Sequence, residues 1–135
     1  MDITRRIAMI LIFGAMVAVI VFAVYKAINT PEKRVKDRIA QYASDYYEEY
    51  YYPKIKKNVD ENVFEDVMRQ YAERGIEDGR VTLRQLMLYN GGKFSNELET
   101  ISDYCNLDST IVEIYPEKPY EKENYHVKYK YSCNF

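Results

Sequence analysis

An uncharged apolar run near the N-terminus constrains this chain more than any other feature of its sequence. The run covers the nineteen residues from Ile7 to Tyr25, and it is preceded by two arginines and followed by a lysine. Folded as an α-helix, it would be about 28 Å long, close to the thickness of the hydrocarbon core of a bilayer. We therefore expect residues 1–29 to form a cytoplasmic tail and a transmembrane anchor.

Two alternatives to a permanent anchor remain open from the sequence. The triplet Val21-Phe22-Ala23 has the small and medium side chains that signal peptidase recognises, although the apolar run is longer than that of a usual signal peptide. Burial in a soluble core is disfavoured, because the about 105 to 110 remaining residues could hardly surround such a helix. We expect the segment to be retained as a signal-anchor.

The charge distribution disfavours a nucleic-acid partner. Residues 39–135 carry eighteen acidic and twelve basic side chains, whereas binding to phosphates requires a basic surface. The one basic stripe lies directly after the apolar run and consists of Lys33, Arg34, Lys36 and Arg38. Beside a bilayer we expect this juxtamembrane stripe to contact lipid headgroups, with ordinary solvated helix charges as the alternative.

The two cysteines, Cys105 and Cys133, bear on the compartment of the domain. An even pair favours a disulfide, and disulfides persist outside the cytoplasm. The flanking charges oppose this orientation, because five bases follow the apolar run and two precede it. We give the cysteines more weight and expect residues 30–135 to form an extracytoplasmic domain of the cell envelope. Two buried free thiols are the alternative.

A long helix is predicted directly after the anchor. Thr30 is the expected N-cap, with Pro31 at the first helical position, and Pro53 is expected to end the helix after residue 51. A break from the anchor is expected near Asn29. The predicted apolar face of this helix has helical spacing and consists of Val35, Ile39, Tyr42, Tyr46 and Tyr50.

Shorter helices are predicted in the middle of the chain. A basic linker over residues 54–58 leads to a second helix that is capped by Asn58 or Asp60 and stopped by Gly75. Its expected apolar face consists of Val63, Phe64, Val67, Met68 and Tyr71. Thr82 and Gln85 form a capping-box pattern that begins a short helix, which carries Leu83, Leu86 and Met87. Helical spacing also recurs over residues 95–105.

The end of the chain changes to the two-residue period of a half-buried strand. From Tyr125 to Phe135 apolar and polar side chains alternate, and the β-branched segment 110–115 is expected to pair with this strand as an antiparallel hairpin. The expected fold class is α+β: two or three helices packed on a small antiparallel β-sheet, with a C-terminal disulfide loop.

Tyrosine is the compositional anomaly, with fifteen tyrosines and no tryptophan. Too many cluster near residue 50 for a single buried stripe, and tyrosine provides a large contact area at low entropic cost. We expect Tyr47, Tyr51 and Tyr52 to form part of a contact patch for a protein or glycan at the cell surface. Packing around a thin core is the alternative.

No motif in the chain indicates catalysis, a metal or a cofactor. The one histidine, His126, falls on the polar face of the predicted last strand and is expected to be a surface residue. We expect no metal site, because the chain has no closely spaced cysteine pair. A non-enzymatic interaction or assembly module is therefore favoured over an enzyme, and no sequence feature indicates an oligomeric state.

Three resemblances accompany these expectations. The segments Ile114-Tyr115-Pro116-Glu117 and Tyr131-Ser132-Cys133-Asn134-Phe135 resemble those of small signal-anchored envelope proteins of ultrasmall host-associated bacteria, which implies an envelope location. An apolar N-terminal helix followed by a C-terminal disulfide loop is similar to type IV pilins, which implies a filament subunit; the start of the chain lacks their Gly-Phe junction. Helices followed by a sheet behind one anchor also resemble the NTF2-like periplasmic domains of VirB8-type secretion components.

Overall fold

A computed structural model describes residues 3–28 and 30–135 of the chain, which is divided into two compact units, Met1–Arg34 and Val35–Phe135. The predicted boundary between anchor and domain, after residue 29, lies close to this division. The expected break near Asn29 falls outside the described residues.

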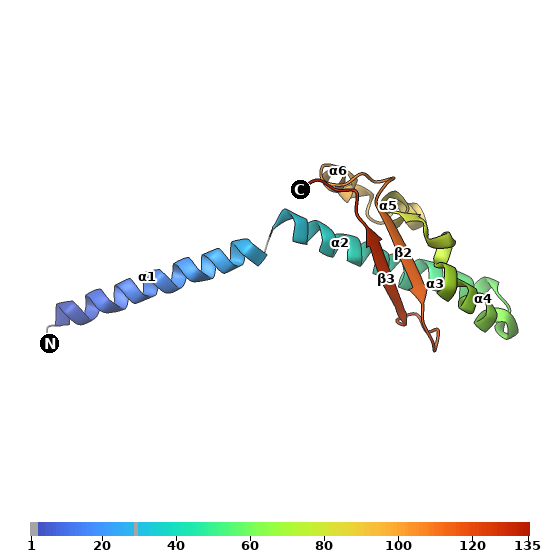
Figure 1. Cartoon of the computed structure of the whole chain (residues 1–135), viewed down its shortest axis with the longest axis horizontal. Helices are drawn as coiled ribbons and strands as arrows, with labels where there is room; N and C mark the ends of the chain where they lie inside the picture. Colours follow the sequence, from blue (N-terminus) through green and yellow to red (C-terminus); the bar gives the residue numbers. More distant parts are fainter. Residues whose placement is uncertain (1–2, 29) are drawn as a thin grey trace. The chain divides into compact units, whose positions relative to one another are not determined.

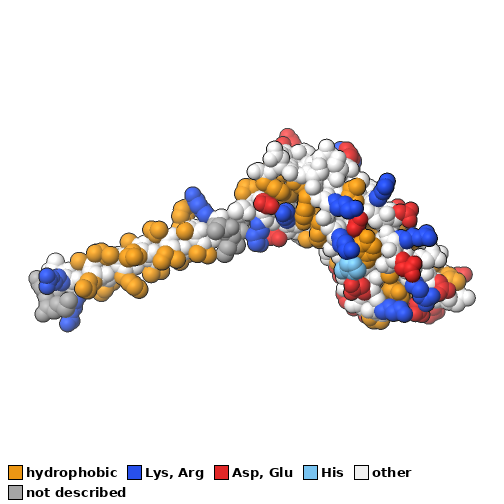
Figure 2. Space-filling model, viewed as in Figure 1, with side chains coloured by type: hydrophobic (Ala, Val, Ile, Leu, Met, Phe, Trp, Pro, Cys, Tyr) orange, Lys and Arg blue, Asp and Glu red, His pale blue; other side chains and the backbone are white. Residues whose placement is uncertain are grey.

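The first unit is dominated by one long apolar helix, α1 (Ile3–Ile28). Figure 2 shows hydrophobic side chains along this helix, and none of its apolar span is buried by protein. Within residues 3–28 and 30–135 it is the one helix that is long and apolar enough to cross a membrane, with a mean hydropathy of 3.0. This length and apolar surface are those of a membrane-spanning helix or of a signal sequence.

The second unit has an α+β fold (Figure 1). Its helical segments are α2 (Pro31–Asp45), the π-helix η1 (Tyr46–Tyr51), α3 (Tyr52–Asn58), α4 (Glu61–Arg74), α5 (Leu83–Gly92) and α6 (Leu98–Ser102), with 3-10 turns η2 (Ile76–Gly79) and η3 (Ser95–Glu97). Its strands are β1 (Val81–Thr82), β2 (Ile111–Pro116) and β3 (Tyr125–Lys130). They form one antiparallel sheet in the order β1-β2-β3.

The predicted start of α2 is confirmed, whereas its predicted end is wrong. The backbone N–H of Lys33 donates to Thr30 Oγ1 at 3.3 Å, which is the expected N-cap. The helix does not stop before Pro53 but widens into η1, where the N–H of Tyr52 donates to the carbonyl of Tyr47, five residues back. Pro53 therefore falls in the first turn of α3, where a missing N–H is tolerated. The predicted linker 54–58 is part of this helix.

Two other helix boundaries follow the capping signals in the sequence, whereas Asp60 is the N-cap residue of α4 without a side-chain hydrogen bond to the helix. Gly75, at φ +81°, ends α4 as expected, because glycine enters this region without steric cost. Thr82 and Gln85 form both hydrogen bonds of the predicted capping box at the start of α5. The expected helix over residues 95–105 is shorter: it divides into η3 and α6, and Cys105 lies beyond it.

The predicted hairpin is confirmed, but its second strand is shorter than predicted. The strand β3 ends at Lys130, where its pairing with β2 stops, and Tyr131 and Phe135 beyond it are 38% and 46% exposed. Strands β2 and β3 pair antiparallel from Ile111↔Lys130 to Pro116↔Tyr125. The predicted disulfide is also present: Cys105 and Cys133 are bonded, and the N–H of Asn134 donates to the carbonyl of Tyr104 beside them at 2.7 Å. The bond joins the chain after α6 to the segment after β3.

The core lies between the helices and the inner face of the hairpin. The side chains that are completely buried come from every layer and include Ile39, Tyr42, Tyr47, Met68, Leu83, Leu86, Met87, Val112 and Ile114. The predicted apolar face of α4 is only partly correct. Met68 is fully buried, but Val63 is 42% exposed, because α4 covers the sheet with one side of its central turns.

Candidate binding site at the tyrosine cluster

The predicted contact patch of Tyr47, Tyr51 and Tyr52 is wrong for its first member. Tyr47 has an exposed fraction of 0%, and its ring centroid lies 4.6 Å from that of Tyr125 in the core. The physical reason is that α2 and η1 bury two adjacent ridges of side chains. Ala43 and Tyr47 form one ridge beside the predicted stripe that includes Tyr42.

Tyr51 and Tyr52 are half-buried, and each contacts another part of the domain. The Tyr51 ring packs against Tyr71 of α4, with 6.0 Å between centroids. The Tyr52 hydroxyl donates a 2.8 Å hydrogen bond to the carbonyl oxygen of Tyr120 in the loop between β2 and β3. These two residues therefore connect elements of the fold and do not join Tyr47 in one outward surface.

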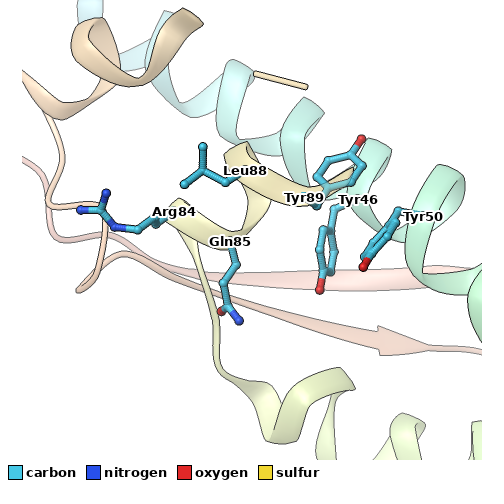
Figure 3. A pocket seen from close by; sticks show the side chains of 6 residues that line it. All are labelled: Tyr46, Tyr50, Arg84, Gln85, Leu88 and Tyr89. Atoms are coloured by element: carbon cyan, nitrogen blue, oxygen red, sulfur yellow. The ribbon is translucent and has the colours of Figure 1, made fainter. Parts of the chain in front are cut away.

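A cavity lined by tyrosines lies instead between η1 and α5. A shallow cavity of about 350 Å³ is lined there by Tyr46, Tyr50, Arg84, Gln85, Leu88 and Tyr89 (Figure 3). We refer to these six residues as the tyrosine cluster. Its aromatic residues come from both elements, so the packing of α5 on η1 assembles it.

The three rings of the tyrosine cluster support one another. The Tyr89 ring is perpendicular to that of Tyr46, with 5.3 Å between centroids, and lies 5.2 Å from that of Tyr50. Figure 3 shows the side chains of Tyr46, Tyr50 and Gln85 extending to the same side, and that of Tyr89 extending the other way. Leu88 is 38% exposed beside them, so the cluster combines a packed aromatic floor with an exposed apolar edge.

The polar groups of the cluster are held in place by local bonds. Gln85 Oε1 accepts a 2.8 Å hydrogen bond from the backbone N–H of Thr82, which fixes the direction of the amide group. The Arg84 guanidinium forms two bonds to the Asp108 carboxylate, at 2.8 and 3.1 Å, and lowers the pKa of that carboxyl. A partner that covers this edge would therefore bury Arg84 together with its counter-charge Asp108, and would not have to desolvate an unpaired charge.

The loop after α5 is tied to η1 next to the cluster. Lys93 Nζ contacts the carboxylates of Asp45, at 3.3 Å, and Glu49, and these bonds raise the pKa of Lys93. Burial raises the pKa of Tyr46 to about 12, so its hydroxyl is a neutral donor at physiological pH. The Tyr89 hydroxyl is buried and makes no hydrogen bond within the described residues.

The juxtamembrane basic residues do not have the same environment. Lys33 and Arg34 are exposed in the first turn of α2. Lys36 is half-buried, with its ammonium 4.9 Å from the centroid of the Tyr131 ring. Arg38 pairs with Glu97 of η3, which raises the pKa of Arg38. Of the four residues that were predicted to contact lipid headgroups, Arg38 therefore forms an ion pair within the domain instead.

His126 is a surface residue, as predicted. Its Nδ1 lies 2.6 Å from Glu117 Oε1, and its ring stacks on Tyr115. Tyr115 and His126 are partners in the register of β2 and β3, and Cys133 follows the opposite end of β3. The arrangement gives His126 a structural contact with the neighbouring strand.

Sequence reasoning missed the contribution of α5 to the site. Leu86, Met87, Leu88 and Tyr89 are four consecutive apolar residues, and a helix packed on one side cannot bury all of them. The predicted face included Leu86 and Met87 and left Leu88 unassigned. The position of Leu88 next to Tyr89 in this run was therefore the available sign of an exposed apolar contact surface.

Comparisons with known proteins do not assign this chain to a family. No protein-family model, curated protein or solved structure matches this chain.

Proposed function

We propose that this protein is a membrane-anchored, non-enzymatic interaction module of the cell envelope, and that its extracytoplasmic domain binds a protein partner through the tyrosine cluster. The observation that carries the proposal is the exposure of Leu88 at the edge of a cavity built from Tyr46, Tyr50 and Tyr89. Aromatic side chains in such a setting are the residues on which binding energy concentrates in protein interfaces.

The architecture of the cavity supports a protein as the occupant. It is open and shallow, and its exposed edge includes Leu88 and the half-buried Tyr50, whereas Tyr46 and Tyr89 are buried beneath. An extended or helical segment with one apolar anchor fits such a surface, with the Gln85 amide nitrogen and the hydroxyl of the half-buried Tyr50 available to its backbone. A glycan would need more polar groups directed at one point, so it is the alternative outcome of the test below.

Two features support the membrane-anchored, extracytoplasmic location. Helix α1 presents an apolar surface that water would not solvate favourably. The Cys105–Cys133 bond is of the kind that persists in oxidising compartments and is rare in the cytosol. Together they favour insertion of α1 with the disulfide side outside.

Protease protection with thiol labelling on intact cells tests the location. We expect added protease to remove residues 30–135 without cell lysis, and both cysteines to react with maleimide only after reduction. A domain that resists protease until lysis, with thiols that react without a reductant, would contradict the extracytoplasmic placement.

Site-specific photocrosslinking tests the binding surface. With benzoylphenylalanine in place of Leu88, we expect one covalent adduct of defined mass in intact cells, and we expect Tyr50→Ser to abolish it. The matched control places the same probe at Val63 of α4, which is similarly exposed but lies outside the tyrosine cluster. Equal adducts at both positions would show unspecific contact. Loss of the adduct after glycosidase treatment would identify a glycan.

A further inference from the structure

A second and larger cavity lies away from the tyrosine cluster. It has a volume of about 540 Å³ and is formed by α3, α4 and the loop between β2 and β3. Its lining includes Tyr52, Lys56, Glu61, Phe64, Glu65 and Glu121. A smaller cavity of about 230 Å³ shares Lys56, Glu61 and Phe64 with it.

Two aromatic rings form one wall of this cavity. The rings of Tyr52 and Phe64 are perpendicular, with 6.0 Å between centroids. The hydrogen bond from the Tyr52 hydroxyl to Tyr120 fixes the ring against the hairpin loop. The wall therefore keeps its shape without a ligand, because both the helix side and the loop side hold it.

The ammonium group of Lys56 already lies over these two rings. Lys56 Nζ lies 4.6 Å from the centroid of the Phe64 ring and 5.9 Å from that of Tyr52. These are distances at which a cation is attracted by the negative face of an aromatic ring. The ring faces are thus oriented for a cation, and the chain's own lysine takes that position.

Three carboxylates line the same cavity and form no ion pair in the part of the chain that the structure describes. Within the described residues, no ion pair within 4.0 Å involves Glu61, Glu65 or Glu121, and none involves Lys56. The charges of the tyrosine cluster, by contrast, are paired. With Lys56 and Lys118 counted, the cavity lining has three negative and two positive side chains, so its formal charge is −1.

We propose that this cavity binds a quaternary ammonium group, and that Lys56 occupies the aromatic wall in its absence. A trimethylammonium group carries its charge over a larger surface than a lysine ammonium and is less strongly hydrated, so aromatic faces and nearby carboxylates recognise it well. The group has two natural sources, a free choline-like cation and a phospholipid headgroup. The inference does not depend on the function proposed for the tyrosine cluster.

Titration of the full chain with choline chloride tests the site. The protein is held in maltoside micelles, because phosphocholine detergents would contain the ligand, and binding is followed by NMR shifts of aromatic protons. We expect saturable shifts of Tyr52 and Phe64. The neutral isostere 3,3-dimethylbutan-1-ol should bind at least about tenfold more weakly, since it lacks the charge. Equal affinity for the two compounds would overturn the proposal.

Two substitutions have opposite expected effects. Phe64→Leu keeps an apolar side chain but removes a ring face, and should weaken choline binding about tenfold. Lys56→Met removes the internal competitor and should strengthen binding about threefold or more, a gain that misfolding cannot imitate. The matched control is Lys54→Met, because Lys54 lies over the ring of Tyr50 outside this cavity and should not affect choline. Unchanged affinity in both Phe64→Leu and Lys56→Met would overturn the site.

The source of the group is distinguished with a short-chain lipid. Monomeric dihexanoylphosphatidylcholine, used below its micelle concentration, should bind at least tenfold more tightly than choline if the site accepts a lipid headgroup, and no better than choline if it accepts a free cation. Leu88→Asp should leave both affinities unchanged, so that failure of the tyrosine cluster as a binding surface is separable from failure of the cation site.

Discussion

The hydroxyl of Tyr125 on β3 donates a 2.9 Å hydrogen bond to Glu48 Oε2 on η1, which joins the last strand directly to the π-helix. The ring of Tyr125 packs on Tyr47, which is completely buried. Burial raises the pKa of Tyr125, and also those of Tyr42 and Tyr46, to about 12. The domain thus relies on phenols that stay neutral.

Alkaline pH should unfold the domain in a defined window. A tyrosine in the unfolded chain loses its proton near a pKa of about 10, whereas these three keep theirs to about 12. Below pH 10 both states are protonated and the stability is complete. Between pH 10 and 12 the unfolded state releases more protons, so the free energy of unfolding falls as pH rises.

Tyrosinate absorbance at 295 nm and far-UV circular dichroism should report this transition together. The absence of tryptophan leaves the absorbance to the fifteen tyrosines. We expect a late phase of tyrosine ionisation that coincides with loss of helix, and Tyr125→Phe should reduce its amplitude. Complete ionisation near pH 10 with an unchanged helical signal would contradict the prediction.

Breaking the disulfide should destabilise the domain substantially. The two cysteines are separated by 28 residues, and closure of such a loop contributes about 3 to 4 kcal/mol by the chain-entropy estimate. Urea denaturation of the Cys105→Ala/Cys133→Ala variant should show a lower midpoint, with a slope at least as steep because the unfolded chain is no longer cross-linked. A midpoint equal to that of the oxidised protein would mean that the bond contributes nothing.

Thr110→Val should loosen the end of the chain. Thr110 is completely buried, and its Oγ1 accepts a 3.1 Å hydrogen bond from the N–H of Ser132, next to the disulfide. Valine has nearly the same shape but cannot accept this hydrogen bond, a loss of about 0.5 to 1.5 kcal/mol. Hydrogen exchange at Ser132 should accelerate. The control Thr100→Val, on the exposed side of α6, should change the stability by less than about 0.5 kcal/mol.

Glu113→Gln should remove part of the acid sensitivity of the hairpin. Lys130 Nζ lies 3.0 Å from Glu113 Oε1 across β2 and β3, and this bond lowers the pKa of the carboxyl. The pair therefore stabilises the fold above the ordinary glutamate pKa, and its contribution is lost as pH falls through the depressed value. We expect the variant to melt slightly earlier at pH 7, by no more than about 1 kcal/mol, and like the wild type at pH 2. A melting difference that persists at pH 2 would assign the effect to packing.

Local signals in the sequence predicted much of the fold. Thr30, Gly75 and the Thr82–Gln85 pair are capping signals whose effect depends on a few neighbouring residues, and all three act as expected. The two-residue alternation after Tyr125 predicted the hairpin, because pairing needs only a partner strand of matching pattern. The disulfide followed from the even number of cysteines, on which the expected compartment was also based.

The features that sequence reasoning missed depend on tertiary packing. β1 has two residues, too few to show a period, and it exists because it pairs with β2 at Val112 and Ile111. The burial of Tyr47 requires the sheet to cover a second ridge of α2 and η1, which no helical period specifies. The tyrosine cluster needs α5 against η1, a contact between segments about 40 residues apart.

The π-helix has a consequence for which changes of length the chain tolerates. One residue fewer in η1 would restore a regular α-helix and turn everything after it by about 100° around the helix axis. Tyr52 would then point away from Tyr120, and Pro53 would meet a backbone carbonyl of the preceding turn. A single-codon deletion between Tyr46 and Tyr51 should therefore be far more damaging than one in the loop that contains Glu121, although both remove one residue from a chain of the same length.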